Sequence, residues 1–159
     1  MPFKVKGPMV RSPRLLSALS IALAIGWANL AVADPAEDLF DAATRGDLAA
    51  GQALLANGVD VNAELSNNAT AFMAAAQNDC LDVARVLLAR GADVNARTKN
   101  RMTALIYASV KGDLDLVQEL SAKGADVNVK VNDGTSALQA ARLRGHANVE
   151  SLLVQAAAK

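Results

Sequence analysis

The segments GVDVNA (58–63), GADVNA (91–96) and GADVNV (124–129) are three copies of one short pattern, and their spacing decides the fold. Each copy begins with a glycine, and Gly58, Gly91 and Gly124 are equally spaced along the chain. A constant period of between about 20 and 50 residues is the signature of a protein built from stacked structural units. The sequence therefore predicts a repeat protein.

The same step, from position 58 to 91 and from 91 to 124, links three more sets of positions. Within each period, two short helix-forming stretches are separated by a turn and closed by the Gly-Asp-Asn segment. We predict a unit of helix, turn, helix and extended loop, present four times over roughly 35–63, 64–96, 97–129 and 130–159. The linked positions form a leucine column (Leu54, Leu87, Leu120, Leu153), an apolar column (Leu39, Phe72, Leu105, Leu138) and a turn column (Gly46, Asp79, Gly112, Gly145).

This pattern resembles the ankyrin repeat over nearly all of the chain after Ala33. The family's Thr-Pro-Leu-His motif is present as TAFM (70–73), TALI (103–106) and SALQ (136–139), which keep the hydroxyl and the apolar residue. We expect each hydroxyl to cap a helix, the glycine of GADVN to be left-handed, and its Asp and Asn to bond to nearby backbone. The resemblance implies an all-α solenoid of four helix-turn-helix units with short β-hairpin-like loops.

The N-terminal segment 1–33 has the order of a secretory signal peptide. Four basic residues and no acidic one accompany an apolar run, and Ala31-Val32-Ala33 precedes Asp34. We expect cleavage after Ala33 and a periplasmic or secreted bacterial protein, free of the membrane once cleaved. The alternative is an uncleaved anchor, because the segment 15–33 is almost long enough to cross a bilayer.

The composition excludes several classes of site. The whole chain has 16 basic and 16 acidic residues, and the part after Ala33 is mildly acidic, which argues against a general nucleic-acid binder. One His and one Cys rule out histidine clusters, paired-cysteine zinc sites and disulfide frameworks. We therefore predict no metal site, no cofactor and no catalytic residue.

Two residues could still support an enzyme. His146 lies at a turn where the ankyrin pattern itself has a histidine, so we interpret it as structural. Cys80 begins a second helix, where partial positive charge could lower the thiol pKa and favour oxidation, although simple packing in the turn is the preferred interpretation. The alternative of an enzyme using carboxylates or Cys80 remains open, but three aspartates recur at one loop position and are interpreted as turn residues: Asp60, Asp93 and Asp126.

In ankyrin proteins, the finger-like loops and the exposed side of the first helices form a concave binding face. Transferred to this sequence, that face is neutral at its N-terminal end and basic further on, which would steer an acidic partner surface. We expect a monomeric scaffold that acts as an adaptor, stabiliser or inhibitor of another exported protein. A structural protein bound to the cell wall is the alternative, and so is a face that is merely solvated. The predicted protein-binding residues are Lys99, Asn100, Arg101, Met102, Val110, Lys111, Lys130, Asn132, Leu143 and Arg144.

Overall fold

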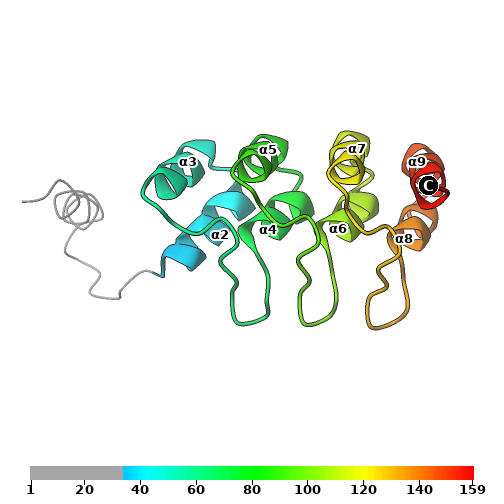
Figure 1. Ribbon diagram of the computed structural model, residues 1–159, viewed down its shortest axis with the longest axis horizontal. Coiled ribbons are helices and arrows are strands. Elements are labelled where there is room, and N and C mark those ends of the chain that lie inside the picture. The colour runs from blue at the N-terminus through cyan, green and yellow to red at the C-terminus, as the bar shows by residue number, and fades with distance from the viewer. Residues whose placement is uncertain (1–33) are drawn as a thin grey trace, which may run out of the picture. The chain divides into compact units, whose positions relative to one another are not determined.

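The computed structural model describes residues 34–159, and the predicted signal peptide lies outside these described residues. Residues 34–159 form eight helices and no strand, so the predicted all-α fold is confirmed. The helices alternate between two layers, with α2, α4, α6 and α8 in one and α3, α5, α7 and α9 in the other (Figure 1). Their bounds are α2 Pro35–Arg45, α3 Leu48–Ala56, α4 Ala71–Gln77, α5 Leu81–Ala89, α6 Ala104–Lys111, α7 Leu114–Ala122, α8 Ala137–Leu143 and α9 Ala147–Ala157.

Hydroxyl side chains begin the inner helices, as predicted. Thr70, Thr103 and Ser136 each accept a hydrogen bond from the backbone N–H three residues later. At α8 the cap is reciprocal, because the Gln139 side chain accepts from the Ser136 N–H at 3.0 Å. Caps of this kind satisfy N–H groups that have no partner inside the helix and stabilise by about 1 kcal/mol each.

The turn column reverses the chain between the two helices of each unit. All four residues have a left-handed backbone, with φ between 60° at Asp79 and 78° at Gly112. Glycine adopts this conformation without strain, whereas a residue with a Cβ does so at a cost of about 1–2 kcal/mol. The glycines that open GADVN are also left-handed, which confirms the predicted end of the second helices.

The core runs through all four units and thins at both ends. In the leucine column Leu87, Leu120 and Leu153 are at most 1% exposed, but Leu54 in the first unit is only half-buried. In the apolar column the pattern is opposite, because Leu138 in the last unit is half-buried. Each unit is therefore buried by its neighbours, and the terminal units lack one neighbour among the described residues.

Candidate functional site

Three finger loops, which follow α3, α5 and α7, project to the same side of the molecule (Figure 1). Their tips are joined by backbone hydrogen bonds: the Lys99 N–H donates to the Asn67 carbonyl at 3.0 Å, and the Asn132 N–H donates to the Asn100 carbonyl at 3.3 Å. Single antiparallel bridges close the first and third fingers. Lys99, Asn100 and Asn132 are thus held in register along one ladder, which the sequence pattern did not predict.

A second ladder connects the bases of the fingers. The Asn62 side chain donates to the Gly91 carbonyl at 3.2 Å and accepts from the Asp93 N–H at 2.7 Å. Asn95 makes the same pair of bonds to Gly124 and Asp126, 29 and 31 residues further along the chain. The expectation that these asparagines bond to nearby backbone was therefore wrong, because they join successive units.

The aspartates of the GADVN segments are confirmed as turn residues. Asp60, Asp93 and Asp126 each accept from the backbone N–H two residues later, at 2.8–2.9 Å. This local bond fixes the entry to each finger. Because all three carboxylates make the same local bond, none of them differs from the others in its hydrogen bonding.

The exposed side of the inner helices contributes an apolar strip. Tyr107 and Val110 on α6 are half-buried, and Leu143 on α8 is 80% exposed. The Val110 carbonyl lies 3.1 Å from Nε2 of His146, so the turn of the next unit holds this part of the strip in place. The sequence analysis missed Tyr107, although it is the only tyrosine in the chain and stands where α4 and α8 have alanine.

Five predicted cations lie on the fingers or at the ends of the inner helices: Lys99, Arg101 and Lys130 in the loops, Lys111 at the end of α6 and Arg144 just after α8. All five are exposed, and none of them takes part in an ion pair within residues 34–159. Arg97, by contrast, pairs with Asp126 at 3.3 Å near the base of its finger. The nearby Asp133 has its pKa lowered by hydrogen bonds from Thr135, and its negative charge reduces the net charge of the surface.

Arg101 and Met102, two predicted binding residues of the middle finger, differ in exposure. Arg101 is exposed and has a left-handed backbone, with φ of 64°. Met102 is half-buried and packs against the core, while its N–H donates to the Thr98 hydroxyl at 3.1 Å. Only part of the Met102 side chain can therefore meet a partner.

Cys80 and His146 have the packing roles that the sequence analysis preferred. Burial and the charge of Asp79 raise the pKa of the Cys80 thiol, which is the opposite of the lowering considered from its position at the start of a helix. A Cβ placed on Gly46 would lie 3.0 Å from the Cys80 sulfur, and one placed on Gly112 would collide with the His146 ring. Both side chains thus pack against the turn of the preceding unit.

Two further observations on residues 34–159 bear on the kind of site. No three His, Cys, Asp or Glu side chains in this part of the chain are grouped so that they could hold a metal ion. No helix of this region is both long and apolar enough to span a membrane.

A family model of ankyrin repeats in three copies matches residues 39–131, which is more than half of the chain. The chain belongs to the ankyrin-repeat family. Helices α8 and α9 lie beyond the matched residues and continue the same arrangement of helix, turn and helix. No curated protein matches the sequence. Ankyrin repeats indicate a protein-protein interaction module.

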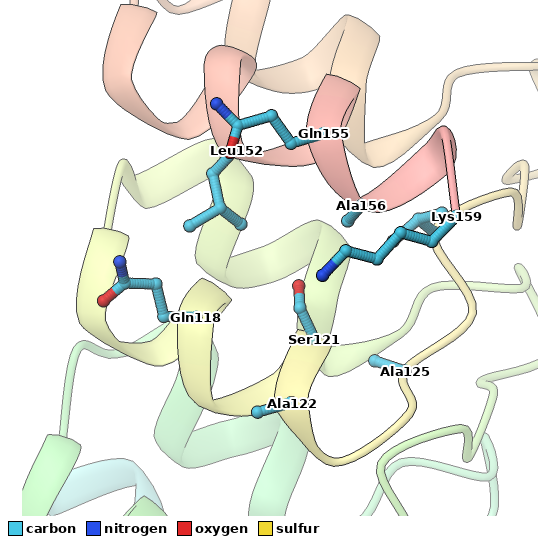
Figure 2. A pocket seen from close by; sticks show the side chains of 9 residues that line it. Gln118, Ser121, Ala122, Ala125, Leu152, Gln155, Ala156 and Lys159 are labelled. Atoms are coloured by element: carbon cyan, nitrogen blue, oxygen red, sulfur yellow. The ribbon is translucent and has the colours of Figure 1, made fainter.

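The ankyrin register also explains a groove of about 480 Å³ between α7 and α9 (Figure 2). Ser121 stands where Leu55 and Leu88 fill the corresponding space, at 7% and 9% exposure. The Ser121 hydroxyl is buried and has no hydrogen-bond partner among the described residues. Leu152 and Lys159 line the opposite wall. The groove follows from one small side chain at a packing position, so it ranks below the finger surface as a binding site.

Proposed function

We propose that this ankyrin-repeat protein is an exported, non-enzymatic scaffold whose fingers and inner helices bind an acidic surface of another exported protein. The observation that carries the proposal is a group of five exposed cations without an ion pair within residues 34–159, on the fingers and inner helices that also carry Tyr107, Val110 and Leu143. The rest of the array is acidic, so the charge is concentrated where the family's binding face lies.

Charge and apolar area have different roles at such a surface. Exposed cations accelerate encounter with an acidic partner and disfavour basic competitors. Leu143 and Tyr107 offer apolar area that a partner can cover, and a few such side chains usually supply most of the binding energy. We therefore expect the cations to control the association rate and Leu143 to control the dissociation rate.

The outcome for the partner would be recruitment, stabilisation or inhibition, since rigid fingers can occupy a surface without chemistry of their own. Export rests on the order of basic, apolar and Ala-Val-Ala segments in residues 1–33. Intact-mass measurement of the protein from its natural host should show these residues missing. A full-length mass in the membrane fraction would indicate the anchor instead.

Binding is tested by reversing Lys99, Arg101, Lys111 and Lys130 to Glu and capturing partners from a periplasmic extract. The fold should survive, because exposed substitutions usually change stability by less than about 0.5 kcal/mol. Capture should weaken through slower association, and capture by the unmodified protein should fall as salt rises, since the screening length shrinks from about 10 Å at 0.1 M to about 3 Å at 1 M.

Two reversals on the outer helices provide a matched control. Arg90 and Lys123 are exposed and follow the last residues of α5 and α7, outside the inner helices and the finger tips. Arg90→Glu with Lys123→Glu should leave capture unchanged, whereas Arg101→Glu with Lys130→Glu should reduce it. Capture that is insensitive to salt and to the reversal of all four cations would refute the basic surface. Co-sedimentation with peptidoglycan under those conditions would support the cell-wall alternative.

A further inference from the structure

The N-terminal end of the array carries acids where the other units have buried alanine. Asp38 corresponds to Ala71, Ala104 and Ala137, which are 1–3% exposed. Ala137 is buried although no described unit follows it. The unit that follows is therefore not what buries a residue at this position. Asp38 is half-buried and Asp41 is exposed, which marks the side of α2 that faces outward along the array axis.

The C-terminal end of the array carries a basic residue where the other units have a buried small residue. Arg142 corresponds to Ala43, Ala76 and Ser109, which are at most 1% exposed. Ala43 is buried although no described unit precedes it, so this position is covered by the unit that follows. Arg142 has no such cover in the described chain: its side chain is 61% exposed and pairs with Glu150 of α9 at 2.7 Å.

An apolar residue accompanies Arg142 at this end. Val154 on α9 occupies the position at which Leu55 and Leu88 are covered by the next outer helix, at 7% and 9% exposure. Val154 is 49% exposed. The C-terminal end thus presents part of an inter-unit contact surface with nothing against it among the described residues.

The two ends have opposite charge. Residues 34–56 contain five acidic side chains and one basic, while residues 137–159 contain three basic and one acidic. Charged terminal units keep a repeat array soluble, and either sign would serve that purpose. Ends of equal sign would repel a second copy, whereas ends of opposite sign attract one.

We propose that the C-terminal end of one molecule docks against the N-terminal end of a second copy, so that the arrays associate head to tail. The contact brings Arg142 and Val154 against the face that carries Asp38 and Asp41. This departs from the sequence-based expectation of a monomer. A head-to-tail contact uses two different surfaces, so it generates rings or open chains rather than a closed two-fold dimer. Arg142, Val154, Asp38 and Asp41 are not among the predicted protein-binding residues.

The test measures the mass of the purified protein by analytical ultracentrifugation over a range of concentrations. The weight-average mass should rise with concentration beyond that of a dimer, and it should fall when salt is raised to about 1 M, where surface charges are screened. Reversal of one end, as Glu37→Arg with Asp38→Arg and Asp41→Arg or as Arg142→Glu with Lys159→Glu, should weaken association at least about tenfold, because each variant then has ends of equal sign.

Mixing the two variants supplies the decisive comparison. One variant has two basic ends and the other has two acidic ends, so the mixture should associate although neither does so alone. Circular dichroism of each variant checks that the helices are intact. A constant monomer mass at all concentrations would overturn the proposal. So would equal association of the unmodified protein and both separate variants, since that result would locate the contact on another surface.

Discussion

The contact between the second and third units and the contact between the third and fourth units have the same register but different packing. Between α5 and α7, Leu88 is 9% exposed and Arg85 pairs with Glu119 at 2.8 Å. Between α7 and α9, Ser121 replaces the leucine and a groove remains. The outer layer is therefore better filled between the second and third units.

At the turns, by contrast, the contact between the third and fourth units is the better packed of the two. Between the third and fourth units, His146 packs over Gly112 and lies 3.1 Å from the Val110 carbonyl. Between the second and third units, Asp113 occupies the equivalent position near Asp79, and one buried Asp113 oxygen has no hydrogen-bond partner among the described residues. The repeat determines where a contact forms, while the residues present determine how well it is made.

The largest effect should come from the core that both contacts share. Leu87 is fully buried, and Leu87→Ala should lower the free energy of unfolding by about 2–5 kcal/mol. Leu54→Ala, at the same position of the first unit, should cost less because Leu54 is only half-buried. Urea denaturation followed by circular dichroism measures both. Equal losses would contradict the difference between inner and terminal units.

Gly112→Ala should destabilise the turn contact between the third and fourth units, where His146 packs over Gly112. The substitution introduces left-handed strain of about 1–2 kcal/mol and places a Cβ against the His146 ring. We expect a loss of at least this size in thermal or urea unfolding. In the double variant with His146→Ala, the steric part of the loss should disappear and the left-handed strain should remain. A double variant that is less stable than the sum of the two single changes would refute this account.

Ser121→Leu should improve the poorer outer contact. Leucine at this position restores the side chain present at Leu55 and Leu88 and covers the groove wall near Leu152. We expect stabilisation of about 1 kcal/mol, less than the roughly 1.5–3 kcal/mol of a fully buried leucine because the groove is partly open. Ser121→Ala is the control, since it removes the unpartnered hydroxyl without filling space. A loss of stability in Ser121→Leu would mean that the groove cannot accept the side chain.

The smallest effect should be the pH dependence of stability that arises from Asp113, at the turn contact between the second and third units. Burial and the neighbouring Asp79 raise the pKa of Asp113 above its ordinary 3.8. The folded protein therefore holds this proton more tightly than the unfolded chain does. The contribution of Asp113 to stability consequently falls as pH rises from about 3.8 through the raised folded pKa, and it stays low above that value.

Asp113→Asn isolates this contribution, because asparagine also caps helices but does not ionise. The variant should be more stable than the natural protein at neutral pH, and the two should converge in acid. Urea unfolding at a series of pH values from acid to neutral checks this. A difference that is independent of pH would show that Asp113 does not titrate against Asp79.

The constant period of the sequence was enough to predict the architecture, the helix caps and the left-handed turns. These features depend on local chemistry: a hydroxyl before a helix, a glycine where φ is positive, and a leucine at a constant step. Each can be predicted from one unit at a time. The basic character of the fingers was also visible in the sequence, because Lys99, Arg101 and Lys130 recur around predicted loop tips.

Only the tertiary structure decided the contacts and the burial that arise between units. Asn62 and Asn95 bridge to residues of the adjacent unit, and burial raises the pKa of Cys80. Leu143 and Val154 are exposed in the last unit, which no further unit covers among residues 34–159. The same residue type at the same step can be buried or exposed, as Leu54 and Leu87 show. Burial is a property of the stacked neighbours, and a single unit of sequence does not contain it.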